Sequence, residues 1–345
     1  MTAREKALSK RSRIPVVSNL VDCIYGCLPA PFFVYNGQVA PSLMMNRIPG
    51  SALVVLSVGM FVGLVYQANE LLGFNFGVSA FIPVFVHWFL FFFHAVPNQS
   101  EKLFDLAGQI AFHAMAIFSF SIAMKRKNGP HPRQVFTTIL ALLWSFRLGW
   151  FLFSRFLERR SDFRFIEARK KHGYHMFAWT SQGVWCFIQG LPLLLLNLVE
   201  KTNDNHPGEP LNRIDRLGWM LLLTGLAIET VADKQKLAFQ RSYPKRSSRP
   251  FIQQGLWSLS RHPNYCGESL VWFGIYLSCF GSYESQSHKL IALAGALFSP
   301  IFLMQTSLPW IEHLSDKKYQ NSQQYWEYKY STSAYLLLPK RPNFV

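Results

Sequence analysis

The chain has 345 residues, of which 50% are hydrophobic and only 16% are charged, and its 35 lysines and arginines against 19 aspartates and glutamates give a formal charge of +16. Soluble domains carry about 25% charged residues, so this chain is poor in charge and strongly basic at the same time. The composition excludes a disordered chain and a collagen-like chain, and five cysteines in so long a chain exclude a disulfide scaffold.

Long apolar stretches distinguish a membrane protein from a large soluble one, because a helix needs about 20 mostly apolar residues to cross the hydrocarbon core of a bilayer. The stretches that come close to this length are residues 51–68, 79–97, 103–124, 134–156, 183–199, 215–232, 266–283 and 289–310. Because the fifth and the seventh are short or punctuated by glycine and proline, the sequence predicts an all-α fold, a polytopic bundle of seven or eight transmembrane helices in a lipid bilayer.

Three regions follow from this pattern. Residues 1–50 form a basic N-terminal segment that we expect to be interfacial or flexible, without the apolar core of a cleavable signal peptide. Residues 51–132 hold the N-terminal transmembrane helices. Residues 133–345 form a second transmembrane region with long polar loops and a C-terminal tail.

The positive charge is distributed along the chain in a way that indicates the orientation of the bundle. With eight spans, the N-terminus, the basic loops 157–182 and 233–265 and the C-terminal tail fall on one side of the membrane. By the positive-inside rule this side is cytoplasmic, and we expect the endoplasmic reticulum to be the membrane. The basic loop 125–133 falls on the opposite side and does not fit the rule. Charge spread over loops in this way argues against nucleic acid as a partner, and the cysteines show no metal-ligand spacing, so no metal is expected.

Two acidic residues, Glu229 and Asp233, lie four residues apart in the sixth apolar stretch and therefore share one helix face near its cytoplasmic end. Because two like charges repel, the sequence predicts a cation or a hydrogen-bond donor opposite them. An ion pair with Lys236 or Arg241 meets this requirement, and so do the amide or hydroxyl donors of a ligand.

A second polar cluster surrounds the start of the seventh stretch, where Pro263 suits the first turn of a helix. Its members are Arg261, His262, Asn264, Tyr265 and Glu268. A helix N-terminus with free backbone N–H groups beside an arginine is an anion site of the kind that holds a phosphate or pyrophosphate. Asn264 and Glu268 lie four residues apart on the same face and offer an amide and a carboxylate just inside the membrane.

These residues resemble the steroid 5-alpha reductase superfamily. The resemblance is carried by SRHPNYCGE at residues 260–268, by ETVADKQ at 229–235 and by the tail EYKYSTSAYLLLP at 327–339. The chain is most similar to the branch named for a domain of unknown function, with a C-terminal domain like that of 3-oxo-5-alpha-steroid 4-dehydrogenases. Sterol C14 reductases are relatives, and isoprenylcysteine carboxyl methyltransferases share a similar RHPxYxG element.

The resemblance implies that residues 133–345 are a reductase-like domain whose C-terminal helices and cytoplasmic loops bind NADPH. The family's N-F-x-G-E element contributes an Asn and a Glu to the cofactor site, which match Asn264 and Glu268. An upstream N-x-x-x-D pair matches Glu229 and Asp233, with Glu in place of Asn. The arginines that neutralise the cofactor phosphates in the family correspond to Arg147, Arg155 and Arg159, with a different spacing.

The catalytic residues stay unassigned. The catalytic tyrosine of the steroid enzymes falls near Trp144, and their N-terminal substrate glutamate has no clear counterpart. Reduction of an activated double bond also needs a proton donor. His87, His94 and His113 are candidates from the apolar stretches, without a carboxylate partner at helical spacing.

The expected function is a membrane-embedded, NADPH-dependent reductase of a lipid or sterol-like substrate that transfers hydride to an activated carbon–carbon double bond. Two alternatives remain open at this point. One is an S-adenosylmethionine-dependent methyltransferase of the isoprenylcysteine type. The other is a non-catalytic membrane scaffold or lipid-binding relative. The sequence does not indicate the oligomeric state.

Overall fold

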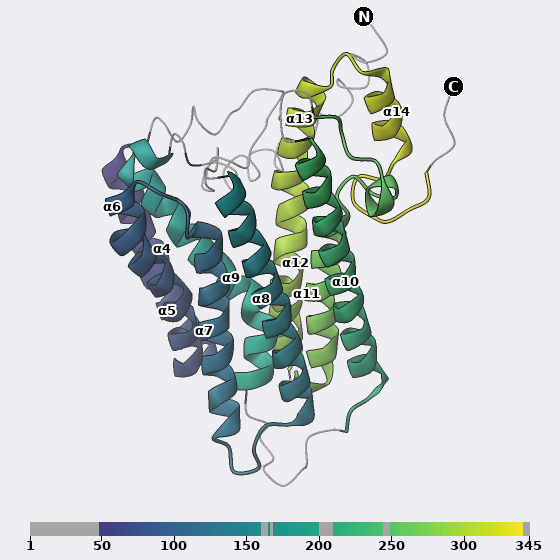
Figure 1. Cartoon of the computed structure of the whole chain (residues 1–345). Coiled ribbons are helices and arrows are strands. Elements are labelled where there is room, and N and C mark those ends of the chain that lie inside the picture. The colour runs from purple at the N-terminus through teal and green to yellow at the C-terminus, as the bar shows by residue number, and fades with distance from the viewer. Residues whose placement is uncertain are drawn as a thin grey trace, which may run out of the picture.

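The computed structural model describes residues 48–159, 165, 168–199, 210–243, 249–283 and 285–340, and these form a bundle of long helices (Figure 1). The expected N-terminal segment 1–50 lies almost entirely outside the described residues. The helices are α4 (Gly50–Leu72), α5 (Phe74–Leu90), α6 (Val96–Asn98), α7 (Phe104–Met124), α8 (Pro132–Arg159), α9 (His172–Leu198), α10 (Arg213–Ser242), α11 (Pro263–Cys279), α12 (Gln286–Phe302), α13 (Leu308–Lys318) and α14 (Gln323–Ser331). Two π-helical turns, Phe91–Ala95 and Leu303–Ser307, join α5 to α6 and α12 to α13 without a break. The prediction of an all-α polytopic bundle is confirmed.

Within the described residues, six continuous helical segments are long and apolar enough to cross a membrane. They are Gly50–Leu72, Phe74–Asn98, Phe104–Met124, Pro132–Glu158, His172–Leu198 and Gln286–Lys318. The remaining long helices, α10 and α11, correspond to the expected stretches 215–232 and 266–283 and run alongside the others (Figure 1). The number of spans therefore stays a prediction.

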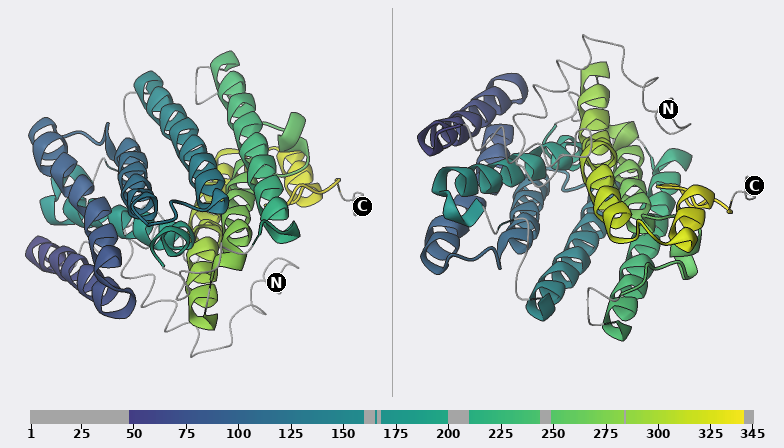
Figure 2. Two further views of the ribbon diagram at one scale, coloured as in Figure 1. Left: turned by 90° about the horizontal axis from the view of Figure 1, so that it is seen from below. Right: turned by 90° about the horizontal axis from the view of Figure 1, so that it is seen from above.

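Viewed along its axis, the bundle has α9 near its middle (Figure 2). This helix packs against α4, α5 and α7 on one side and against α11 and α12 on the other. The N-terminal half has an aromatic core, in which the Trp179 ring lies 5.2 Å from Phe104 and 6.0 Å from Phe91 between ring centroids. The polar residues expected to form a site lie in the other half, on α8, α10 and α11.

Helices α10 and α11 touch backbone to backbone because glycines face each other. A Cβ added to Gly225 would lie 2.5 Å from the carbonyl oxygen of Gly267, and one added to Gly267 would lie 2.7 Å from the amide nitrogen of Glu229. Gly218 and Gly274 form a second such contact, since a Cβ on Gly274 would lie 2.6 Å from the Gly218 oxygen. Small residues allow close approach of helices inside a membrane. The contact brings Glu229 beside the turn of α11 that carries Glu268.

A buried ion pair closes the opposite end of this half of the bundle. The guanidinium of Arg133 on α8 donates to both carboxylate oxygens of Asp215, at 2.7 and 2.8 Å, and both side chains are almost completely buried. Asp215 also accepts from the backbone N–H of Asn212 at 2.7 Å, in a capping box that starts α10. Arg133 further donates to Ser282, just after α11, at 3.1 Å. The relative positions of α8, α10 and α11 are thus fixed at the end distant from α14.

Candidate functional site

The core of the candidate site is an ion cluster between α8 and α10. Arg147 lies 2.8 Å from the Glu229 carboxylate and donates to Asp233 at 2.7 Å. Only 4% of the Glu229 side chain and 7% of the Asp233 side chain are exposed. The cation in direct contact with both carboxylates is therefore Arg147, which the family resemblance assigns to a cofactor phosphate, while Lys236 also acts on Asp233. Arg241 instead pairs with Glu158 near the end of α8.

Aromatic rings enclose this cluster on the side of the bundle core. The indole N–H of Trp144 donates to Glu229 at 2.8 Å. The ring of Trp144 stands edge-on to that of Trp272 at 5.0 Å, and Phe112 lies within 6.1 Å of both. Trp144 occupies the region where the family resemblance places a catalytic tyrosine, and here it holds a carboxylate.

On α11, Asn264 and Glu268 occupy successive turns of one face, as the sequence predicted from their spacing. The Oγ–H of Ser299 on α12 donates to Glu268 at 2.7 Å. Asn264 Oδ1 is buried and accepts no hydrogen bond from any described residue. An unsatisfied acceptor inside a helix bundle is costly, and such an atom indicates a missing polar partner.

Two further buried polar atoms near Glu268 also lack partners within the described part of the chain. They are the side-chain amide nitrogen of Gln189 on α9 and the indole nitrogen of Trp272, one turn beyond Glu268 on α11. Gln189 uses its oxygen to accept from Trp185 at 2.9 Å, and its amide lies close enough to Glu268 to act on that carboxyl. Donors and an acceptor thus meet in one region, which suits a ligand group that both donates and accepts hydrogen bonds.

Arg261 does not face this region, because its donors are used elsewhere. It forms a two-pronged ion pair with Glu312 on α13, at 2.7 and 3.0 Å. Its remaining Nη1 donates to the backbone carbonyls of Lys329 and Thr332, the latter at 2.6 Å. The expected role of Arg261 in anion binding is therefore replaced by a structural one, which is to hold the end of α14 and the start of the tail.

The C-terminal tail lies along the start of α11. Arg261 donates its backbone N–H to Ser333, and the Leu338 N–H donates to Leu259 at 3.2 Å. The Tyr335 hydroxyl bonds the Ser269 hydroxyl and donates to the Tyr265 carbonyl at 3.2 Å. The tail segment 332–338 therefore covers one side of the helix start that the sequence predicted as a site.

His262 and Tyr265 form part of this cover. Their rings stack at 5.4 Å between centroids, and His262 Nε2 lies 3.4 Å from a Glu312 oxygen. Burial lowers the pKa of His262, and the adjacent Glu312 opposes this effect only in part. The lowered pKa favours the neutral form of the His262 imidazole beside the helix start.

The two other arginines predicted to contact phosphates have different positions. Arg155 lies on α8, two turns beyond Arg147, 3.8 Å from Asp105 and about one-third exposed. The side chain of Arg159 lies outside the described residues. The structure therefore brings together Arg147, Glu229, Asp233, Asn264 and Glu268, while Arg261 and His262 belong to the contacts of the tail.

The histidines that the sequence offers as proton donors form their hydrogen bonds with groups other than these carboxylates. His87 Nδ1 lies 2.6 Å from the Pro83 carbonyl, and its ring belongs to the aromatic core around Trp179. His113 Nδ1 lies 2.9 Å from the Gln109 carbonyl and 3.2 Å from the Ser145 hydroxyl. Neither is bonded to a carboxylate.

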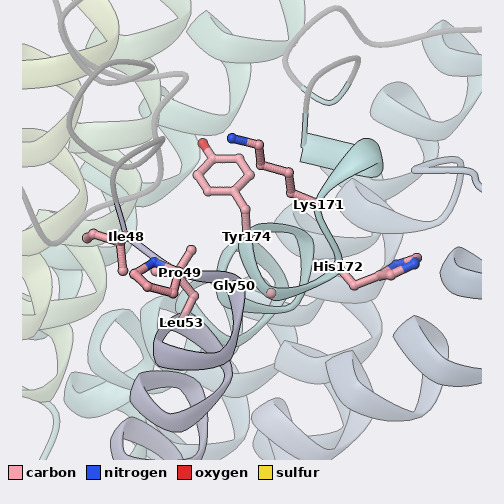
Figure 3. Close-up of a pocket in the computed structure, with 8 residues that line it drawn as sticks. Ile48, Pro49, Gly50, Leu53, Lys171, His172 and Tyr174 are labelled. Atoms are coloured by element: carbon pink, nitrogen blue, oxygen red, sulfur yellow. The ribbon is translucent and has the colours of Figure 1, made fainter.

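Two cavities, of about 360 and 320 Å³, lie away from this site, near the N-terminal ends of α4 and α9, and the first is drawn in Figure 3. Leu53, His172 and Tyr174 line the first, and Val54, Phe91 and Met176 line the second. None of the predicted site residues lines either cavity. In the part of the chain that the structure describes, no group of three potential metal ligands occurs.

Four residues at or beside the site were not predicted from the sequence: Ser299, Gln189, Trp272 and Glu312. Glu312 alone had a signal in the sequence, because it is a carboxylate close to the end of the last apolar stretch. The other three are ordinary residues of apolar helices, and only their contacts across the bundle identify them.

The comparisons with known proteins give a family without an assigned activity. No curated protein and no solved structure matches the chain. The family described as "Protein of unknown function (DUF1295)" matches residues 87–332, which include all of α7 to α14. The chain belongs to this DUF1295 family.

Proposed function

We propose that the chain is a membrane-embedded, NADPH-dependent reductase that transfers hydride to an activated carbon–carbon double bond of a lipid or sterol-like substrate. The observation that carries the proposal is the buried, unpartnered Asn264 Oδ1 beside Glu268, on the face where the resemblance to the steroid 5-alpha reductase superfamily expects the cofactor. We expect the protein to reside in the endoplasmic reticulum membrane, with both termini in the cytoplasm if the bundle has eight spans.

The residues present fit the nicotinamide end of the cofactor. A primary carboxamide carries two N–H donors and one carbonyl acceptor, so Asn264 Oδ1 supplies the acceptor that it needs. The amide nitrogen of Gln189 offers a donor beside the Glu268 carboxyl. NADPH would supply the hydride, and the residues of the chain would orient the ring and exclude water.

The phosphate end needs cations other than Arg261, whose donors are taken by Glu312 and the tail. Arg147 is paired with Glu229 and Asp233, so it is also committed. Arg155 is partly exposed and lies on the helix face that continues from Arg147 toward the end of the bundle with α14. We assign the phosphates to Arg155.

The proposed substrate reaches the site from the lipid phase. Trp144, Trp272 and Phe112 form the apolar wall next to the carboxylates, and such a wall suits a hydrocarbon skeleton.

The test is equilibrium binding of NADPH to the purified full-length protein in detergent, with Asn264→Leu as the variant and Asn98→Ala, an exposed side chain on α6, as the control. Because loss of a buried hydrogen bond costs about 1–3 kcal/mol, Asn264→Leu is expected to raise the Kd about tenfold or more. The control is expected to bind as the parent does.

The two rival classes give different results in the same assay. Saturable binding of S-adenosylmethionine without a response to NADPH would indicate the methyltransferase. Binding of neither cofactor by a monodisperse, helical sample would indicate a non-catalytic relative. Either result contradicts the proposal.

A further inference from the structure

Three carboxyl groups share the surroundings of one guanidinium in the candidate site. Arg147 contacts Glu229 and Asp233 directly, and Lys236 and Arg155 also act on Asp233. Glu268 adds a third carboxyl, because the backbone contact between α10 and α11 places it next to Glu229. The carboxyl groups of Glu268 and Glu229 interact electrostatically, and Asp233 and Arg147 also act on Glu268.

The groups that contact Glu268 from the other helices are neutral. Ser299 on α12 donates a hydroxyl hydrogen bond at 2.7 Å, and Gln189 on α9 presents an amide. Tyr335 of the tail is the remaining titratable group that faces it, and burial raises the pKa of that phenol to about 12, so it is uncharged at neutral pH. Arg147, Glu229, Asp233 and Tyr335 are thus the charged or titratable groups that the described helices and tail direct toward Glu268.

We infer that Glu268 holds a proton at neutral pH and is the acid of the site. A carboxylate inside an apolar bundle without a cation in contact takes up a proton instead of staying charged. Glu229 and Asp233 both contact Arg147, and Trp144 adds a donor to Glu229. Among the described residues no cation forms an ion pair with Glu268, which accepts a hydrogen bond from Ser299 instead, and Glu268 is therefore the member of the cluster that takes the proton.

The role of this proton rests on the proposed function. When one carbon of an activated double bond receives hydride from the reduced nicotinamide, the neighbouring carbon must receive a proton. Glu268 would supply it: the carboxyl O–H bond breaks, a C–H bond forms, and the resulting carboxylate regains a proton from water. An acid that retains its proton near neutral pH suits this step.

The protonation state can be measured without cofactor or substrate. The infrared spectrum of the full-length protein in lipid nanodiscs at pH 7 is expected to contain the carbonyl band of a protonated carboxyl group. Glu268→Gln is expected to remove this band. Glu327→Gln, an exposed glutamate on α14, serves as the control and is expected to leave the band unchanged.

Changing the neighbouring charges gives a second readout, which a merely structural Glu268 would not produce. Glu229→Gln removes a negative neighbour, so the band is expected to titrate away about one pH unit or more lower. Arg147→Met removes the cation and is expected to add carboxyl band intensity at pH 7. If Glu268→Gln fails to fold, Glu268→Asp is expected to shift the band instead of removing it.

The outcomes separate this inference from the proposed function. Absence of the band in the parent protein, or its persistence in folded Glu268→Gln, overturns the inference even if NADPH binds. Presence of the band in a protein that does not bind NADPH supports the proton on Glu268 and overturns only the reductase proposal.

Discussion

Arg147 is the residue on which the geometry of the site depends. It lies on α8, whereas both of its acidic partners lie on α10, so the ion cluster joins two helices that otherwise touch little along this stretch. The side chains of Glu229 and Asp233 are almost fully buried, and without Arg147 both would be uncompensated charges. Removing one partner of such a cluster therefore lowers the stability of the protein more than replacing all of its charged members by neutral residues.

We expect Arg147→Met to destabilise the protein by about 3 kcal/mol, the lower end of the range for breaking a buried ion pair, because its side chain is one-fifth exposed. The measurement is thermal unfolding in detergent, followed by circular dichroism. Arg155→Met is the matched control, and since its ion pair is longer and more exposed, a change below about 1 kcal/mol is expected.

Adding Glu229→Gln and Asp233→Asn to Arg147→Met is expected to recover much of the lost stability, because no buried charge then remains unpaired. Equal losses in Arg147→Met and Arg155→Met would contradict the importance given to this cluster.

The partners of the buried charges could be predicted from the sequence only in part. The requirement for a cation opposite Glu229 and Asp233 was predicted from like charges on one helix face, and the structure supplies that cation from α8. Its identity was missed because the contact joins residues more than 80 positions apart and no local pattern encodes it. Arg261 is the same case, since Glu312 lies 51 positions along the chain and competes for the guanidinium.

At the scale of elements, the contact between α10 and α11 sets the position of Glu268. The facing glycines carry no side chains at these contacts, so Glu229 and Gly267 come within reach of each other. Adding a single methyl group would push the helices apart and separate Glu268 from the ion cluster.

We expect Gly225→Ala to destabilise the protein by about 1–3 kcal/mol, because the new Cβ would lie 2.5 Å from the Gly267 oxygen and 2.7 Å from the Val271 nitrogen. Gly63→Ala on α4 is the matched control, since nothing lies within 4 Å of its Cβ. It is expected to be neutral or to stabilise the helix by about 0.5–1 kcal/mol. Similar melting temperatures for both variants would show that the helices are not in close contact.

The helices themselves were predicted well from apolar length, because a bilayer imposes a minimum length on each crossing segment. Their ends were predicted less well. α9 begins at His172 and not at 183. The sequence did not indicate its first turns because they are polar and aromatic, although packing buries most of them in the structure. α10 continues to Ser242, beyond the expected end at 232. Its last turns are polar, so the length of the apolar stretch did not indicate them. Helix α14 and the course of the tail carried no apolar signal and were not predicted.

At the scale of the whole molecule, the polar residues of the site are ordered along the bundle axis. Asn264 lies at the start of α11, Glu268 one turn further in and Trp272 another turn beyond. Arg155 and the tail lie at the end of the bundle that carries α14 (Figure 1). A cofactor with its phosphates at this end would place its ring against Asn264 and Glu268, and an apolar substrate would meet it from the aromatic wall.

The decisive property of the proposed reductase is hydride transfer from NADPH to a lipid. The full-length protein in nanodiscs would be incubated with a lipid extract and NADPH deuterated at the transferable position, and the lipids would be analysed by mass spectrometry. We expect a lipid product that carries one deuterium and is absent when Asn264→Leu or Glu268→Ala protein is used. Absence of deuterium from every lipid, or transfer of a labelled methyl group from S-adenosylmethionine in a parallel incubation, would contradict the proposed reductase activity.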